Sequence, residues 1–267
     1  MIVLMRGGGD LASGVAVRLF RAGFQVIITE LPQPLAVRRL VSFAEAIYRG
    51  ETTVEGVTAR LAEDPKQARR ILSSGQTPVL IDPRAEARYL FDPMVMVDAR
   101  MTKRAPELGM GAAALVIGLG PGFIAGENCH AAVETQRGHR LGRVIWQGAL
   151  QPDTRIPDSV AGHRAERVLR APADGILKAR AEICDHLEPG DLIAEVDGGA
   201  IRAPFRGVLR GLLHSGLGVR SGLKVGDLDP RDDPSYCSLV SDKALAVGGG
   251  VLEAILARPD LRLHLWD

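Results

Sequence analysis

The sequence predicts an α/β protein in which a mainly parallel sheet, covered by helices, is followed by a smaller, β-rich domain. Three observations support this fold class. Short apolar runs alternate with helical patterns up to about residue 150, which is typical of a parallel sheet. A polar segment rich in proline and glycine then interrupts the pattern. Beyond it, short strands separated by glycines replace the alternation, and one motif recurs at a fixed spacing.

The alternation begins at the first residues. An apolar run at 2–5 predicts a strand, and the spacing of apolar residues over 11–20 predicts a helix that Gly23 ends. Residues 26–28 predict the next strand. The segment 40–62 fits neither pattern. Further strands are expected at 79–81, 95–97 and 115–117, and further helices at 65–74 and 127–136.

These patterns divide the chain into four parts. Residues 1–150 form the α/β domain, and the polar residues 151–165 form a linker. Residues 166–230 form the β-rich domain, and residues 231–267 form a helical tail.

Three consecutive glycines interrupt the helical pattern of the tail. Each of Gly248, Gly249 and Gly250 weakens a helix by about 1 kcal/mol relative to alanine. Either two helices meet at this point, or one helix packs its backbone very closely against a neighbour. We favour close packing, at the domain interface.

An internal repeat marks the β-rich domain. The motif Arg170-Ala171-Pro172, followed by Gly175-Ile176-Leu177, recurs 32 residues later as Arg202-Ala203-Pro204, followed by Gly207-Val208-Leu209. The same offset maps Gly190 onto Gly222 and Asp197 onto Asp229. It predicts two pseudo-symmetric β units that complete one sandwich, because neither unit alone buries a face.

The repeat resembles the barrel-sandwich hybrid domains of biotinyl and lipoyl carriers. The likeness lies in the segments 171–175 and 189–196. In those carriers a hairpin tip presents the modified lysine, whereas the tip here, residues 197–200, reads Asp-Gly-Gly-Ala. The resemblance therefore implies a barrel-sandwich-hybrid-like fold without the carrier function.

Composition excludes several classes of protein. A net charge of +1 and only 4% aromatic residues argue against a nucleic-acid-binding protein. No apolar run approaches the roughly 20 residues that span a bilayer, and the first residues lack a signal-peptide core. Three widely spaced cysteines indicate a reducing compartment, so we expect a cytoplasmic protein without a disulfide framework or a dedicated metal site.

The first glycine-rich loop predicts a Rossmann-like nucleotide site. Residues 7–12 fit the pattern G-x-G-x-x-A between a strand and a helix, where backbone N–H groups and the helix N-terminus stabilise a phosphate. An acid at the end of the second strand has the spacing of a ribose-binding residue. The alternative is a glycine turn with Asp10 as a helix cap and no ligand. The predicted binding residues are Gly7, Gly8, Gly9, Asp10 and Glu30.

A second loop with Gly118, Gly120 and Gly122 lies between a predicted strand and a predicted helix. We expect it to form another anion-binding turn at the same edge of the sheet. Cys129 then falls in the first turn of the predicted helix, where the helix dipole would lower its pKa and favour a reactive thiolate. The alternative makes Cys129 a small buried apolar residue.

Basic residues follow the predicted helix. Arg137, Arg140 and Arg143 are candidate ligands for a phosphate or a molybdate-like anion, with His139 as a proton donor. The alternative is a solvated charged surface.

Taken together, these motifs resemble the YqeB family. The resemblance lies in residues 7–14, 118–123, 134–139 and 224–231 and continues through 241–243 and 248–253. YqeB proteins are accessory proteins of selenium-dependent molybdenum hydroxylases. The α/β part is more distantly similar to the xanthine dehydrogenase accessory (XdhC) family, which helps to mature and insert the molybdenum cofactor.

The resemblance implies a maturation role with a molybdenum hydroxylase as client. The implied ligand is a molybdenum cofactor, another molybdopterin-type molecule or a dinucleotide. Two alternatives stay open: an NAD(P)-dependent oxidoreductase, supported by the first glycine loop, and a non-catalytic scaffold that docks a client enzyme. Assembly into a homo-oligomer also stays open.

Overall fold

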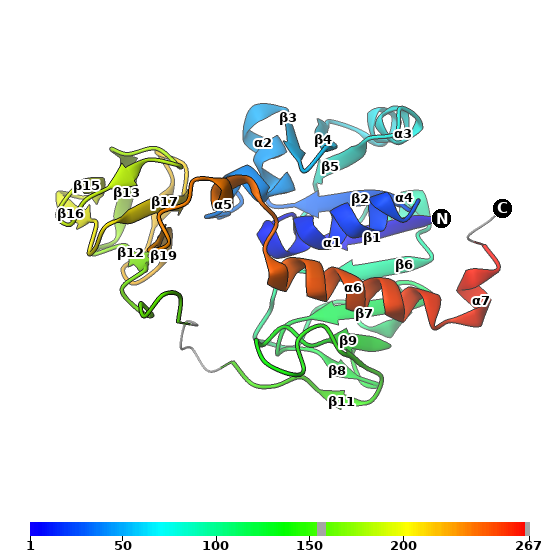
Figure 1. Ribbon diagram of the computed structural model, residues 1–267. Coiled ribbons are helices and arrows are strands. Elements are labelled where there is room, and N and C mark those ends of the chain that lie inside the picture. Colours follow the sequence, from blue (N-terminus) through cyan, green and yellow to red (C-terminus); the bar gives the residue numbers. More distant parts are fainter. Residues whose placement is uncertain (154–158, 265–267) are drawn as a thin grey trace. The chain divides into compact units, whose positions relative to one another are not determined.

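A computed structural model describes residues 1–153 and 159–264, in two compact units (Figure 1). Unit 1 comprises residues 1–34, 42–153 and 240–264 of the described chain. Unit 2 comprises residues 35–41 and 159–239. The middle of the predicted linker, residues 154–158, lies outside the described residues, as do the last three residues of the predicted tail.

Unit 1 is built on a mixed nine-stranded sheet with the strand order β10-β9-β7-β6-β1-β2-β5-β4-β3. Most neighbouring strands are parallel, but β3 and β10 at the two edges pair antiparallel with β4 and β9. The strands are β1 (Ile2–Arg6), β2 (Gln25–Glu30), β3 (Glu51–Val54), β4 (Val57–Ala62), β5 (Thr77–Ile81), β6 (Val95–Asp98), β7 (Leu115–Leu119), β9 (Ala131–Val133) and β10 (Val144–Ile145). A separate pair, β8 (Ile124–Ala125) and β11 (Gly148–Ala149), completes the strands of this unit.

The Rossmann-like assignment is therefore wrong, although the unit remains α/β. A doubly wound sheet alternates strands with covering helices, whereas the segment between β2 and β5 contains the β3–β4 hairpin. The connection from β5 to β6 holds only the short helix α4 (Arg88–Phe91). Short apolar runs located the strands, but they carry no information about the connections between them.

The helix predicted at 127–136 is also wrong, because this segment contains strand β9. Glycines at 120, 122 and 126, together with Pro121, disfavour a helix just before it. Three small or β-branched residues, Ala131 to Val133, then pair with β7 and are fully buried. A short apolar run does not distinguish a buried strand from a buried helix.

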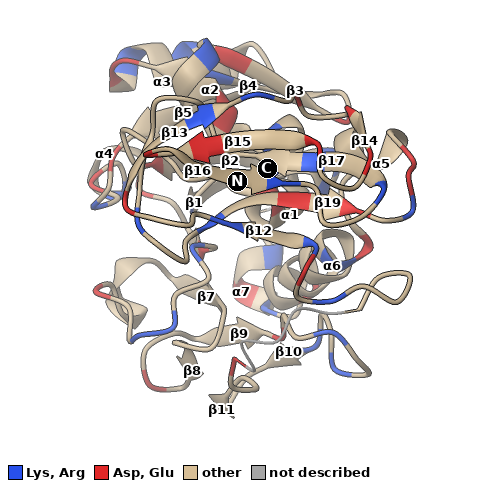
Figure 2. Cartoon of the chain, turned by 90° about the vertical axis from the view of Figure 1, so that its left-hand side faces the viewer, with Lys and Arg blue, Asp and Glu red and all other residues tan. Residues whose placement is uncertain are grey.

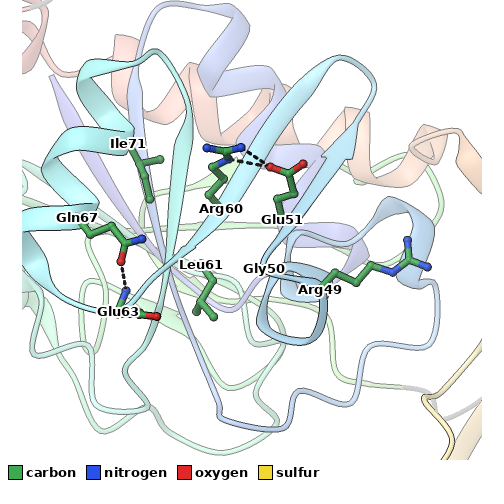
Figure 3. A pocket seen from close by; sticks show the side chains of 8 residues that line it. All are labelled: Arg49, Gly50, Glu51, Arg60, Leu61, Glu63, Gln67 and Ile71. Carbon is green, nitrogen blue, oxygen red and sulfur yellow. Dashed lines mark hydrogen bonds and ion pairs between the residues drawn. The ribbon is translucent and has the colours of Figure 1, made fainter.

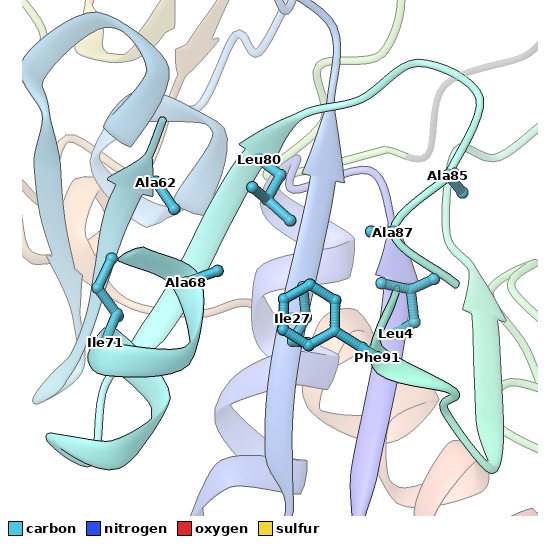
Figure 4. Packing of buried hydrophobic residues seen from close by; sticks show 9 residues of the cluster. All are labelled: Leu4, Ile27, Ala62, Ala68, Ile71, Leu80, Ala85, Ala87 and Phe91. Atoms are coloured by element: carbon cyan, nitrogen blue, oxygen red, sulfur yellow. The ribbon is translucent and has the colours of Figure 1, made fainter. Parts of the chain in front are cut away.

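Three longer helices cover the sheet: α1 (Asp10–Arg21), α3 (Pro65–Ser73) and α6 (Asp242–Leu256). The side chain of Asp64 caps α3 by accepting a hydrogen bond from the Gln67 backbone N–H at 2.7 Å. Figure 4 shows the buried cluster between the sheet and the helices α3 and α4, to which Phe91 of α4 and Ile27 and Leu4 of the sheet belong. Shorter helical turns are α2 (Ala46–Arg49), α7 (Pro259–Arg262) and the 3₁₀ turns at Phe43–Glu45 and Met110–Ala112.

Helix α6 belongs to unit 1 rather than to a separate tail, because it packs alongside α1 (Figure 1). It is one continuous helix through the three glycines. A Cβ atom at Gly248 would lie 3.0 Å from Cγ of Arg18, and one at Gly250 would lie 2.1 Å from the Gly142 carbonyl oxygen. Close packing is thus confirmed, but its partners lie within unit 1.

Unit 2 contains two small antiparallel sheets of four strands each, with the orders β12-β19-β17-β14 and β16-β15-β13-β18. It also contains the short helix α5 (Ser235–Ser238) and a 3₁₀ turn at Arg39–Val41. The strands are β12 (Val168–Arg170), β13 (Gly175–Ala179), β14 (His186–Leu187), β15 (Leu192–Val196), β16 (Gly199–Arg202), β17 (Gly207–Leu212), β18 (Gly218–Val219) and β19 (Lys224–Asp229).

The hydrogen bonds of unit 2 confirm the internal repeat. The Gly190 N–H donates to the Ala203 carbonyl, and 32 residues further the Gly222 N–H donates to the Ala171 carbonyl, both at 2.8 Å. The offset also relates the two sheets, since it maps β13 onto β17 and β15 onto β19. Each half contributes strands to both sheets, so the two halves complete one another.

Basic and acidic residues are interspersed over both units (Figure 2), in line with the net charge of +1. No helix of the described residues combines the length and the hydrophobicity that a membrane-spanning segment needs.

Candidate functional site

The carboxyl ends of the parallel strands bring distant loops of unit 1 to one edge of the sheet. In the strand register, Arg6 at the end of β1 pairs with Asp98 at the end of β6, and Asp98 pairs with Gly118 in β7. The two glycine loops therefore lie at the same edge, as the sequence predicted, with β6 between them. Open α/β sheets bind ligands at this edge.

The first glycine loop is occupied by a side chain of the protein itself. The Gly8 N–H donates to Oε1 of Glu30 at 2.7 Å, and the Leu31 N–H donates to Oε2 at 2.8 Å. Burial raises the pKa of Glu30, and the two backbone hydrogen bonds oppose this rise. Glu30 thus fixes the loop and takes the N–H group that a pyrophosphate would need. Its predicted role in holding a ribose is corrected to a structural one.

Other residues of the first loop remain accessible. Gly9, not Asp10, is the N-cap of α1, and a Cβ atom at Gly9 would meet nothing within 4 Å. The Asp10 carboxylate accepts a hydrogen bond from the Leu11 N–H at 2.8 Å. Gly7 has φ +92°, a conformation that glycine adopts without strain.

The second glycine loop is packed rather than open. A Cβ atom at Gly118 would lie 2.1 Å from the Phe123 ring, and one at Gly122 would lie 2.2 Å from the Arg104 carbonyl oxygen. At Gly120, with φ +115°, the Cα atom of Met101 would be 2.9 Å away. These glycines serve close packing against neighbouring segments, so the prediction of a second anion-binding turn is corrected.

Cys129 is a core residue. It is fully buried in an apolar cluster with Met96, Phe123 and Leu150. Burial raises the pKa of the Cys129 thiol to about 11, the opposite of the predicted lowering. The reactive-thiol role is wrong because the helix that was expected to supply the dipole is absent at this position.

We expect Cys129 to resist alkylation in the native chain. Iodoacetamide at pH 8 should modify the half-buried Cys184 first and should reach Cys129 only on unfolding, since access and thiolate fraction both limit the rate. Peptide mass spectrometry over a time course measures this order. Labelling of Cys129 at the rate of Cys184 would contradict the buried assignment.

The basic segment after β9 lies on an exposed loop. Arg137 forms a bidentate ion pair with Asp242, with distances of 2.6 and 2.7 Å, and Nε of Arg143 donates to the backbone carbonyl of His139. His139 and Arg140 are exposed. Because Arg137 is neutralised and Arg143 holds its own loop, these residues do not converge as an anion site would require.

The sequence analysis missed a buried ionic network at the same edge. Nη1 of Arg6 lies 3.1 Å from Oδ2 of Asp98, and both side chains are almost completely buried. Arg100 contacts both oxygens of Asp98, at 2.9 and 2.7 Å. Charged residues directly after two predicted strands were the available signal.

Both arginines of the network also contact one exposed carboxylate. Arg100 donates to the two oxygens of Glu107 at 3.1 and 2.7 Å, and Arg6 reaches Oε2 at 3.3 Å. The side chain of Glu107 is 68% exposed. The hydrogen bonds from Arg100 lower the pKa of Glu107 to about 2. Burial opposes the charged form of Arg100, but its bonds to Asp98 and Glu107 outweigh this and raise its pKa.

A surface cavity of about 320 Å³ adjoins this network. It is lined by residues of the loop after β5: Ile81, Asp82, Pro83, Arg84 and Glu86. The Pro83 carbonyl accepts a hydrogen bond from Arg6 at 3.2 Å, which joins the cavity wall to the network. The cavity and the two arginines are thus linked through Pro83, and we consider them together as one candidate site.

A second cavity of about 430 Å³ lies beside the β3–β4 hairpin (Figure 3). Its polar groups are paired with one another or with nearby residues. Arg60 binds Glu51 at 2.7 Å, Arg49 binds Glu45 at 3.0 Å, and the Gln67 side chain accepts from the Glu63 N–H. We therefore favour the strand-end site, where two arginines meet a single exposed carboxylate.

The strand-end site presents two guanidinium groups to one exposed carboxylate, an arrangement suited to anions. Within the described ranges, no group of three or more His, Cys, Asp or Glu side chains is placed to hold a metal. The fold and the site define an α/β protein with a mixed sheet whose carboxyl edge carries a buried arginine–carboxylate network.

Comparison with known proteins shows clear sequence similarity to one protein. No family model matches the chain. The uncharacterized protein YqeB of Escherichia coli K12 is 46% identical over 255 residues, which are 96% of this chain and 47% of that protein. This identity supports the YqeB family that the motifs indicated. The chain spans about half the length of this relative.

Solved structures give weaker similarities. An aspartoacylase family protein from Mesorhizobium loti matches 85% of this chain and 84% of its own, at 13% identity and a TM-score of 0.28. A succinylglutamate desuccinylase from a Silicibacter species has the same coverage and identity, with a TM-score of 0.25. An ectoine utilization protein from Ruegeria pomeroyi matches 85% of both chains at 14% identity and a TM-score of 0.25. Scores this low carry no activity over to the chain.

These findings correct the expected function. The YqeB relative is uncharacterized, so the comparisons give no support to the maturation role implied by the resemblance, and it is not retained. The alternative of an NAD(P)-dependent oxidoreductase is weakened by Glu30, which accepts a hydrogen bond from the Gly8 N–H of the first loop.

Proposed function

We propose that unit 1 binds a small oxyanion, such as a molecule with carboxylate groups, at the carboxyl edge of its sheet. One observation carries the proposal: Arg6 and Arg100, both fixed by the buried Asp98, converge on the exposed carboxylate of Glu107. Guanidinium groups held in this way recognise carboxylates with good geometry. In this proposal Glu107 occupies the place that the ligand takes.

The neighbouring cavity would hold the rest of the ligand. It joins the arginine pair through Pro83, and it contains the exposed Arg84 as a further cation. Its volume of about 320 Å³ fits a small metabolite. Because the Glu107 side chain is 68% exposed, a ligand carboxylate can replace it from the solvent side.

Citrate at constant ionic strength is the first probe. We expect citrate to raise the Tm of the full chain more than sodium chloride does, because a bound ligand stabilises the native state. Since the pKa of Glu107 is about 2, this carboxylate stays ionised at neutral pH and competes with citrate. Glu107→Gln should therefore tighten citrate binding about fivefold, which corresponds to the loss of about 1 kcal/mol of competing interaction.

Isothermal titration calorimetry with citrate measures this affinity. Two further variants serve as controls in the same experiment. Arg100→Met should abolish citrate binding. Glu63→Gln removes the same charge from an exposed residue of the other cavity and should leave the affinity unchanged. If Glu63→Gln and Glu107→Gln raise the citrate affinity equally, the effect comes from net charge alone and contradicts the proposal. If Arg100→Met still binds citrate, the citrate site lies elsewhere.

A further inference from the structure

Two of the three cysteines meet in unit 2. The Cys184 N–H donates to the Leu209 carbonyl oxygen at 2.9 Å, and Sγ of Cys237 lies 3.8 Å from the same oxygen. The backbone of Cys184 and the thiol of Cys237 thus share one acceptor, which brings the two residues to the same point of the sheet. Cys184 is half-buried in the turn between β13 and β14, whereas Cys237 in α5 is fully buried. One thiol is therefore partly accessible, and the other is enclosed on the same side of Leu209.

The internal repeat makes Cys184 an unusual residue for its backbone position. Cys184 has φ +85°, a left-handed conformation that strains residues with a side chain. The 32-residue offset maps Cys184 onto Gly216, which has φ +92°. The Gly216 N–H donates to the Leu177 carbonyl, as the Cys184 N–H donates to the equivalent Leu209 carbonyl. A glycine would satisfy this turn, so the cysteine side chain is kept at a cost in strain, as is common at functional sites.

We infer that Cys184 and Cys237 form a redox-active dithiol that low-molecular-weight disulfides convert into an intramolecular disulfide. The step consumes one disulfide such as oxidised glutathione. The Cys184 thiolate attacks one sulfur of that molecule, whose S–S bond breaks and releases one glutathione thiol. Cys237 then loses its proton and attacks Sγ of Cys184, which forms the internal bond and releases the second glutathione. The two cysteines are oxidised and the glutathione disulfide is reduced to two thiols.

The environment of the pair favours the oxidised product. Burial and the hydrogen bond with Cys184 raise the pKa of Cys237 to about 12, and Arg38 and Arg210 only partly oppose this. Surroundings that do not stabilise the Cys237 thiolate do not favour the reduced pair. The same thiolate is a poor leaving group, so a reductant cleaves the disulfide slowly. The disulfide should therefore form slowly and then persist until a strong reductant is added.

Incubation of the full chain in glutathione redox buffers tests the inference. After quenching and unfolding, the number of titratable thiols should fall from three to one, with a peptide cross-link between Cys184 and Cys237 in the mass spectrum. Dithiothreitol should restore all three. Cys129→Ser should form the same cross-link, because Cys129 lies in the core of unit 1.

The variant Cys184→Gly separates the chemistry from folding. It keeps the left-handed turn that Gly216 makes in the other half, so its circular dichroism and Tm should equal or exceed those of the parent chain. It should form no internal disulfide. Three remaining thiols at every redox ratio, a glutathione adduct on Cys184 without cross-linking, or a cross-link that includes Cys129 would each overturn the inference.

Discussion

Asp98→Asn should lower the free energy of unfolding of unit 1 by about 3–5 kcal/mol. The change removes one charge from a pair in which Asp98 is 1% exposed and Arg6 is 3% exposed. The Arg6 guanidinium would then stay buried at the end of β1 with less compensation, and an uncompensated buried charge is expensive. Urea unfolding followed by the helical circular dichroism signal measures the effect, because α1, α3 and α6 all lie in this unit.

Glu107→Gln is the matched control, since it removes a carboxylate from the same network at an exposed position. Exposed ion pairs contribute about 1 kcal/mol or less, so this variant should unfold near the parent midpoint. If both variants lower the free energy of unfolding equally, burial does not set the contribution of each carboxylate. The assignment of Asp98 as the anchor of the network is then wrong.

Gly250→Ala should lower the free energy of unfolding by about 1–3 kcal/mol, even though alanine favours a helix by about 1 kcal/mol. The new Cβ atom would lie 2.1 Å from the Gly142 carbonyl oxygen and 2.7 Å from a methyl group of Val133. A backbone oxygen cannot move away as a flexible side chain would, so α6 must shift away from the segment it packs against.

The neighbouring glycine supplies the comparison. A Cβ atom at Gly249 would meet nothing within 4 Å. Gly249→Ala should therefore stabilise the chain by up to about 1 kcal/mol through helix propensity alone. Thermal unfolding of the two variants side by side should move the Tm in opposite directions, and a shared direction would contradict the packing of α6.

The arginine–carboxylate network also explains how the candidate site is kept ready for a ligand. Asp98 is fixed by the end of β6 and orients both arginines, while Glu107 balances their charge from the exposed loop. The arginines are thus ordered before a ligand arrives, which reduces the entropy lost on binding. Asp98 is therefore a buried anchor, and Glu107 is an exposed carboxylate that a ligand can replace. The variants Asp98→Asn and Glu107→Gln, together with the citrate titration, test these two roles.

The sequence alone determined the local elements whose pattern is strong. Apolar runs located β1, β2, β5, β6 and β7, and helical spacing located α1 and α3. The 32-residue repeat also predicted the pseudo-symmetry of unit 2, in which Gly190 and Gly222 make equivalent hydrogen bonds. These features depend on residues near one another in the chain or on a repeated pattern, and both are visible in a single sequence.

Only the tertiary structure decided what the loops and single residues do. Glu30 became a ligand of the Gly8 backbone, and the glycines of the second loop became contact points for Phe123 and the segment 101–104. Arg6 and Asp98 are 92 positions apart, and Cys184 and Cys237 reach the same Leu209 carbonyl only through the packing of α5 on β17. The physical reason is that burial and charge pairing depend on which distant segments fold together, and local periodicity carries no information about those contacts.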